Sequence, residues 1–175
     1  MGNRVYFAHS NELDKASWQT LHDHLVNTAR IASGLGMDSG LSDLAYIAAL
    51  LHDIGKYSHA FQRRLDGSRH RVDHATAGAR EARNLFQQNE NQKLLATILA
   101  YCIAGHHSGL PDYGSEFDVE TDNTLLARRD KKRLEDFSAY KTDIDPASLT
   151  LPARLAIRPL EKHVGFSLSF LTRML

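Results

Sequence analysis

The 175-residue chain has only one cysteine, Cys102, and only four prolines. A single cysteine cannot form a disulfide within the chain, which argues against a disulfide-stabilised secreted domain. The opening residues, MGNRVYFAHS, contain no apolar run of the kind found in signal peptides. No stretch approaches the ~18 consecutive apolar residues that a membrane-spanning helix needs. We therefore expect a cytoplasmic protein that has no membrane partner.

The sequence also lacks net charge, because Lys and Arg total 21 and Asp and Glu total 21. A chain with this balance has no global positive field that would attract a polyanion such as DNA. Any nucleic-acid site must then be local. The length and the hydrophobic content of 42% are typical of one globular unit. We expect residues 1–175 to form a single domain.

Apolar residues recur at helical spacing along most of the chain, and no segment shows the alternation that is typical of a β-strand. The expected helices span residues 17–33, 41–54, 57–65, 74–88, 91–105, 127–140 and 160–175. Ser17 and Ser42 are the expected N-caps of the first two. Residues 108–126 carry five acids and no base, which indicates a long loop. The sequence therefore predicts an all-α fold.

Five histidines and one aspartate form a candidate metal-binding set: His24, His52, Asp53, His74, His106 and His107. Imidazole and carboxylate ligands together suit borderline divalent ions, and one carboxylate can bridge two of them. Two neighbouring metals are the usual arrangement for phosphodiester cleavage. A lone histidine is more often a structural residue than a ligand, so the prediction depends on the joint arrangement. His22 is a weaker alternative to His24.

Four sequence blocks occur in order: LHDHLVNTA (21–29), LLHDIGKYSHAFQ (50–62), RVDHATAGA (71–79) and IAGHHSGLPD (103–112). The second block resembles the HD signature, in which an apolar helix ends in His-Asp followed by Gly and Lys. Together the blocks resemble the HD-superfamily nuclease domain of type I CRISPR-associated helicase-nucleases. The segments VYFAHS and WQTLHDHL near the start are similar to that family too.

This resemblance implies an HD-domain helical bundle with a metal site between its helices. It assigns His24, His52 and Asp53 to one metal, and Asp53 with His74, His106 and His107 to a second. Asp53 and Lys56 are the implied catalytic residues, with the Lys56 ammonium near the scissile phosphate; the alternative for Lys56 is a solvated side chain. One or two divalent ions are expected, Mn, Fe, Co or Ni, with Mg also compatible.

The resemblance further implies a metal-dependent endonuclease and exonuclease that cleaves single-stranded DNA in CRISPR interference. Its partners would be a helicase domain or subunit and a guide-RNA surveillance complex. The chain has no G-x-x-x-x-G-K-[ST] phosphate loop, so ATP-driven unwinding would have to come from that partner. Two alternatives remain open. One is an HD-type nucleotide phosphohydrolase or cyclic-nucleotide phosphodiesterase, and the other is a catalytically weak docking module for the helicase or the surveillance complex.

The basic segment ARRDKKR at 127–133 is the best local candidate for phosphate contacts. Its candidate DNA-binding residues are Arg128, Arg129, Lys131, Lys132 and Arg133. The remaining histidines, His9, His22, His59, His70 and His163, are expected to be structural.

The family pattern continues with a further metal-binding aspartate after an apolar segment like residues 166–175. The chain contains no such residue there and looks truncated at its C-terminal end. We therefore expect the metal position at His24 to be weakly occupied, and the position at His74 to hold its ion more tightly.

Overall fold

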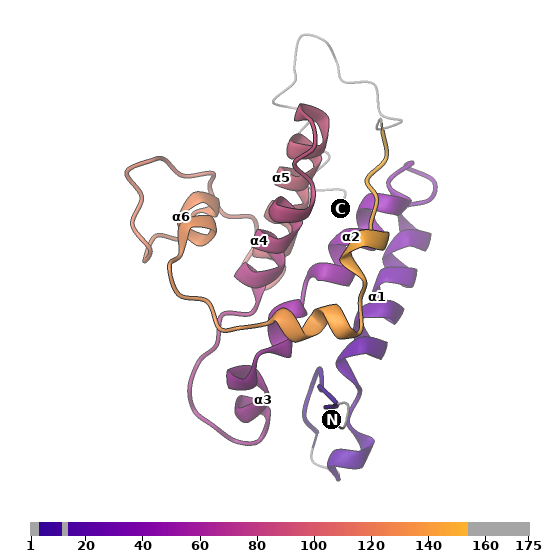
Figure 1. Cartoon of the computed structure of the whole chain (residues 1–175), viewed down its shortest axis with the longest axis vertical. Helices are drawn as coiled ribbons and strands as arrows, with labels where there is room; N and C mark the ends of the chain where they lie inside the picture. The colour runs from indigo at the N-terminus through magenta and orange to yellow at the C-terminus, as the bar shows by residue number, and fades with distance from the viewer. Residues whose placement is uncertain (1–3, 12–13, 154–175) are drawn as a thin grey trace.

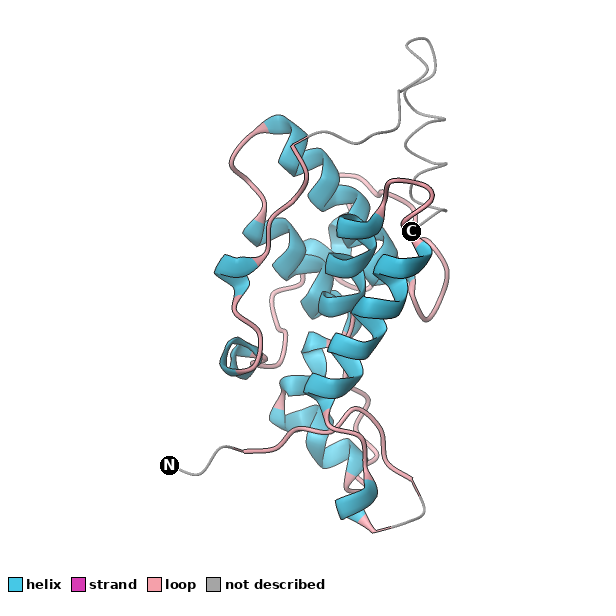
Figure 2. Ribbon diagram, turned by 90° about the vertical axis from the view of Figure 1, so that its right-hand side faces the viewer, coloured by secondary structure: helices cyan, strands magenta, loops and turns pink. Residues whose placement is uncertain are grey.

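The computed structural model describes residues 4–11 and 14–153, and these residues are mostly helical (Figures 1 and 2). The helices are α1 (Leu21–Leu35), α2 (Ser42–Leu51), α3 (His59–Leu65), α4 (Ala75–Leu85), α5 (Glu90–Gly105) and α6 (Leu125–Asp130). Short 3-10 turns are η1 (Lys15–Ser17), η2 (Ile54–Tyr57), η3 (Ser138–Thr142) and η4 (Pro146–Ser148). Within these residues the backbone pairs only in two isolated bridges and forms no strand. The predicted all-α fold is confirmed for the described part of the chain.

The core lies between two helix pairs. Helix α1 packs along α2, α4 packs along α5, and α2 contacts both α4 and α5, which joins the pairs (Figure 1). The apolar residues that recur at helical spacing in the expected helix 41–54 are buried: Leu44, Ile47, Leu50, Leu51 and Ile54. Burial of each such side chain contributes about 1.5–3 kcal/mol. This apolar layer fixes the C-terminal end of α2 deep inside the bundle.

Two glycines allow unusually close backbone contacts around that end of α2. A Cβ atom at Gly78 in α4 would lie 2.1 Å from the backbone oxygen of Leu51. A Cβ atom at Gly55 in η2 would lie 2.3 Å from the backbone oxygen of His74. Neither position has room for a side chain, so only glycine lets the start of α4 approach the residues that follow α2. These contacts bring His74 beside the His52–Asp53 pair.

The structure corrects the expected helix at 127–140, because α6 ends at Asp130. The reason lies in tertiary contacts. Arg80 donates a hydrogen bond to the backbone oxygen of Lys131 at 2.9 Å, and the Lys131 ammonium lies 2.9 Å from the Asp73 carboxylate. Together they hold the chain in an extended course after Asp130, so local helix propensity does not decide the conformation.

The expected N-caps were also wrong. Thr20 caps α1 by accepting a hydrogen bond from the Asp23 amide, whereas Ser17 lies in η1. Ser42 is the first residue of α2, and its hydroxyl donates to the Ser33 backbone oxygen at 2.9 Å.

The helix expected at 57–65 is divided between η2 and α3, and the helix expected at 160–175 lies outside the described residues. The expected loop at 108–126 ends where α6 begins, at Leu125. No helix in the described part of the chain is long and apolar enough to cross a membrane.

Candidate metal centre

Two histidines occupy equivalent places at the ends of helices. His52 is the C-cap of α2 and His106 is the C-cap of α5. The Nδ1 atom of each ring lies 2.6 Å from a backbone oxygen three residues earlier, that of Ala49 or of Ile103. These bonds satisfy carbonyls that a helix end leaves free, and they place the ring proton on Nδ1. Each Nε2 is then available as a ligand at the negative end of a helix dipole.

Asp53 lies at the middle of the cluster, and its side chain is only 3% exposed. Its Oδ2 atom is 3.3 Å from His24 Nε2 and 3.1 Å from His52 Nε2. Its Oδ1 atom is 3.3 Å from His74 Nε2 and 3.5 Å from His106 Nε2. The two oxygens of one carboxylate therefore face two different groups of imidazoles. Asp53 would therefore be able to contribute one oxygen to a divalent ion in each group.

The six predicted ligands fall into two groups that share Asp53. The three-ligand group consists of His24, His52 and Asp53, and the four-ligand group consists of Asp53, His74, His106 and His107. Within each group the potential ligand atoms all lie within 4.8 Å of one another. The structure places His24, and not the exposed His22, in the cluster. It thus brings together every residue of the predicted set, whose role as metal ligands remains a prediction.

The potential ligand atoms of the cluster are hydrogen-bond acceptors that suit a cation better than they suit one another. Asp53 Oδ1 is buried without a hydrogen-bond partner. His74 Nε2 and His107 Nε2 face each other at 2.8 Å, and His24 Nε2 and His52 Nε2 do so at 3.4 Å. Two facing nitrogens of neutral imidazoles can share at most one proton. The nitrogen and carboxylate lone pairs of the cluster therefore outnumber the N–H groups that could donate to them. Because unsatisfied buried acceptors are costly, a divalent ion in each group would stabilise this arrangement.

The electrostatics keep most of these ligands in the state that binds metal. Burial by itself would raise the pKa of Asp53, but the surrounding imidazoles of His106, His24 and His52 outweigh it and hold that pKa far below its usual range. Burial lowers the pKa of His74 to about 4, so its ring is neutral at pH 7. Burial also opposes the charged form of His106, yet the nearby Asp53 carboxylate and the bond to the Ile103 backbone oxygen leave its pKa raised. A proton on His106 Nε2 would compete with metal for this ligand atom.

Lys56 is buried rather than solvated, so the alternative of a solvated side chain was wrong. Its Nζ atom is 2.7 Å from Asp53 Oδ2 and donates to the Ala8 backbone oxygen at 3.2 Å. The ammonium also lies 5.4 Å from the centre of the Phe61 ring. A buried cation in direct contact with Asp53 favours the ionised carboxylate. Its predicted contact with a scissile phosphate remains untested.

His9, which is expected from the sequence to be structural, lies beside the cluster. The His9 ring lies edge-on to the His24 ring, with 5.0 Å between the ring centres. His9 is exposed and stands at the rim of the three-ligand group. No spacing rule connects it to the other histidines. The only signal was its place in VYFAHS, one of the segments that carried the family resemblance.

Some of the candidate DNA-binding side chains are engaged in contacts within the protein, and others line surface hollows. Arg128 donates to the Ala104 backbone oxygen at 2.7 Å and to the Asn123 side chain at 2.6 Å. Arg129 binds its neighbour Asp130 through two hydrogen bonds. These two guanidinium groups are engaged within the protein, and Lys131 is paired with Asp73. Lys132 lines surface hollows beside the chain after α6, and Arg133 lines one of them.

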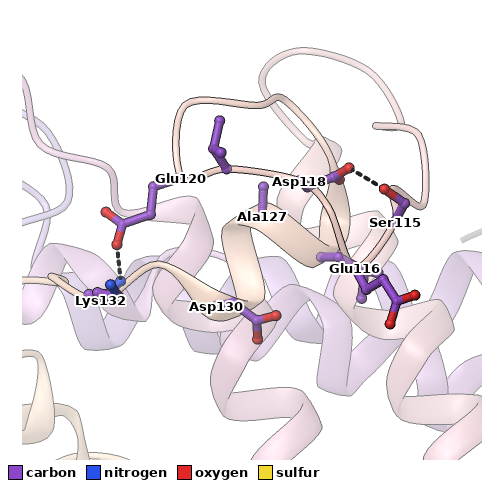
Figure 3. Close-up of a pocket in the computed structure, with 9 residues that line it drawn as sticks. Ser115, Glu116, Asp118, Glu120, Ala127, Asp130 and Lys132 are labelled. Carbon is purple, nitrogen blue, oxygen red and sulfur yellow. Dashed lines mark hydrogen bonds between the residues drawn. The ribbon is translucent and has the colours of Figure 1, made fainter.

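Two of the hollows that Lys132 lines differ in charge. One, of about 390 Å³, lies under the acidic loop (Figure 3), and its charged lining residues are Glu116, Asp118, Glu120, Asp130 and Lys132. The other, of about 530 Å³, carries the charged residues Arg71, Asp73, Lys131, Lys132, Arg133, Glu135 and Asp136. We call this second hollow the 71–133 groove. Its lining includes Asp73, the residue directly before His74 of the four-ligand group.

A scan against protein families matches residues 21–146 to the family described as HD domain. The matched region is well over half of the chain and contains all six predicted ligands. HD domains are typically metal-dependent phosphohydrolases, which agrees with the clustered histidines and the buried aspartate. A search of curated proteins found no match. On the length of the family match, the chain belongs to the HD-domain family.

Proposed function

We propose that this chain is a metal-dependent phosphodiester hydrolase that cleaves single-stranded DNA by endonuclease and exonuclease action. The observation that carries the hydrolase part is the placement of Asp53, whose two oxygens face two separate groups of imidazole nitrogens. Proteins that cleave phosphodiesters commonly use paired divalent ions held in this way. The choice of DNA as substrate rests on the four sequence blocks and on the charge of the 71–133 groove.

The residues of the cluster would divide the work as follows. When bound, two divalent ions would activate a water molecule and neutralise negative charge on the phosphoryl oxygens. His52 and His106 keep their protons on Nδ1 and present Nε2 to the centre. Asp53 remains ionised and joins the two groups, and Lys56 fixes one of its oxygens. Asp53 and Lys56 are the proposed catalytic residues. Manganese, iron, cobalt and nickel suit these ligands best, and magnesium less well.

The 71–133 groove supports a polymeric substrate. In the described part of the chain, Arg71, Lys132 and Arg133 form no ion pair, so their charges are available to phosphate groups. The hollow under the acidic loop carries four acids and one lysine and would repel a polyanion. A strand that reaches the metal centre would therefore be guided along the 71–133 groove. We propose these three residues as DNA contacts in place of Arg128 and Arg129.

The biological setting is proposed from the resemblance to the nuclease domain of type I CRISPR-associated helicase-nucleases. In that setting a guide-RNA surveillance complex exposes single-stranded DNA, and a helicase domain or subunit delivers it to this chain in the cytoplasm.

Circular single-stranded DNA tests the proposal, because only endonuclease attack can open a circle. The purified chain is incubated with the circle and manganese, nickel or magnesium, beside an Asp53→Ala variant. We expect the wild-type protein to linearise and then degrade the DNA, and the variant to leave it intact. Hydrolysis of mononucleotides without cleavage of the circle would instead favour a nucleotide phosphohydrolase. DNA or helicase binding without any hydrolysis would favour a docking module.

A triple substitution of Arg71, Lys132 and Arg133 by alanine tests the groove. We expect weaker binding of a single-stranded oligonucleotide. The slope of log K against log salt should become shallower by about 2, since each phosphate contact that is lost means that fewer counterions are released on binding. Hydrolysis of a small phosphodiester should stay unchanged. The matched control replaces three other exposed cations, Arg30, Arg64 and Lys93. Equal losses in both triple variants would show that the groove has no special role.

A further inference from the structure

The backbone before His9 is fixed by a set of long-range hydrogen bonds. The Phe7 amide donates to the Gln62 side-chain oxygen, and the Gln62 amide group donates to the Phe7 backbone oxygen, both at 3.0 Å. The Ala8 amide donates to the Gln19 backbone oxygen at 3.0 Å, and Ala8 is completely buried. His9 follows directly and is exposed. An exposed histidine thus extends from a well-anchored backbone.

This anchor positions His9 at the metal centre. The ring planes of His9 and His24 meet at 87°, with 5.0 Å between the ring centres. The Ala8 oxygen that precedes His9 accepts a hydrogen bond from Lys56, whose ammonium contacts Asp53. His9 is not part of either group of ligand atoms that lie within 4.8 Å of one another. It therefore stands just outside the ligands, between the three-ligand group and solvent.

The three-ligand group is the side of the centre with the most room for substrate. Among the described residues, this group offers three protein ligands and the other group four, so the three-ligand group leaves more coordination positions for water and for a substrate oxygen. A polar side chain at the open edge of the three-ligand group lies where a bound phosphoryl group would extend. An imidazole N–H can donate a hydrogen bond to a phosphoryl oxygen there, and such charge-assisted bonds are the strong ones.

We propose that His9 is a substrate-contacting residue, which donates a hydrogen bond to a phosphoryl oxygen of the substrate on the His24 side of the centre. This assignment rests on the proposed phosphodiester hydrolase function. It is distinct from a ligand role, because His9 stands outside both ligand groups.

Two substitutions separate the hydrogen bond from the ring contact. His9→Phe keeps an aromatic ring against His24 and removes the N–H donor, whereas His9→Gln restores a donor. His22→Phe is the matched control, because His22 is an exposed histidine of α1 outside the ligand groups. The measurements are metal content, the Kd of inorganic phosphate for the manganese-loaded protein, and kcat and KM for bis(4-nitrophenyl) phosphate.

We expect His9→Phe to retain the wild-type metal content and to bind phosphate about 10-fold to 100-fold more weakly, the range for a lost hydrogen bond to a charged group. The value of kcat/KM should fall by a similar factor. His9→Gln should recover part of both losses, and His22→Phe should match the wild type.

Three results would overturn the proposal. Wild-type phosphate binding by His9→Phe would show that His9 makes no contact. A loss of metal from this variant would give His9 a role in holding the ion. Absence of phosphate binding by the manganese-loaded wild type would show that there is no bound phosphoryl group for His9 to contact. Phosphate binding needs no turnover, so the two proposals can fail separately. If the wild-type protein hydrolyses no phosphodiester but His9→Phe binds phosphate more weakly than the wild type, the His9 contact stands and the proposed function fails.

Discussion

Replacing Asp53 by alanine is expected to remove metal from both ligand groups and to lower phosphodiester hydrolysis at least about 100-fold, more than the 10- to 100-fold typical of residues that only support a ligand. Asp53 belongs to both groups, and each of its oxygens faces a different pair of imidazoles. Loss of any single histidine leaves the bridging carboxylate in place, so its effect should be smaller. Metal content and hydrolysis rates of Asp53→Ala and His24→Ala, measured side by side, check this order.

Misfolding must be separated from loss of the ligand, because Asp53→Ala leaves the buried Lys56 ammonium without its carboxylate. Removing one partner of a buried ion pair costs about 3–5 kcal/mol in the free energy of unfolding. Asp53→Asn keeps the side-chain shape, and Asp43→Ala removes an exposed acid from α2, the helix that ends just before Asp53. Asp53→Asn should also lose metal, while Asp43→Ala should retain it. Wild-type metal content in folded Asp53→Asn would contradict the bridging role.

Gly55→Ala is expected to disrupt the centre although it replaces none of the predicted ligands. The added Cβ would lie 2.3 Å from the His74 backbone oxygen and 2.6 Å from the His74 Cα atom, both parts of a rigid backbone. Overpacking of this kind costs about 1–3 kcal/mol, and relief of the clash must shift the His74 backbone away from Gly55, which changes the position of the His74 ring relative to Asp53. We therefore expect a lower free energy of unfolding in metal-free protein and weaker binding of metal by the four-ligand group. Urea unfolding and metal titration measure the two effects.

Gly34→Ala is the matched control for this substitution. Gly34 lies in α1, and a Cβ atom there would meet nothing within 4 Å. Alanine at an open helical position should stabilise the protein by about 0.5–1 kcal/mol. Metal affinity should not change. If Gly55→Ala binds metal as tightly as Gly34→Ala, the close approach of Gly55 to His74 does not set the geometry of the centre.

The sequence predicts the helices best where apolar periodicity and burial agree. Leu44, Ile47 and Leu51 repeat at helical spacing, and α2 buries them as expected. The prediction fails after Asp130, where contacts with Arg80 and Asp73 decide the backbone conformation. These partners are more than 50 residues away in the chain, so no local propensity could identify them. The wrong N-caps have a similar cause, because Ser42 bonds to Ser33 in the preceding helix.

The membership of the site could be predicted, but its geometry could not. The His-Asp pair and the later histidines are recognisable from residue type and order. The bridging position of Asp53, however, depends on how α1, α2, α4 and α5 pack. Lys56 is buried because its ammonium meets both Asp53 and the Ala8 carbonyl, and His9 lies beside His24 because hydrogen bonds to distant segments fix the backbone of Phe7 and Ala8. Such contacts follow from the fold and leave no spacing pattern in the sequence.

A manganese titration of metal-free protein, followed by electron paramagnetic resonance, tests the metal centre most directly. Free Mn²⁺ gives a strong signal that weakens on binding. We predict that the first equivalent binds tightly in the four-ligand group, that a second binds more weakly beside His24, and that Asp53→Ala binds neither. A free-ion signal in the wild type that grows from the first addition, or equal binding by Asp53→Ala, would contradict a metal centre built on Asp53.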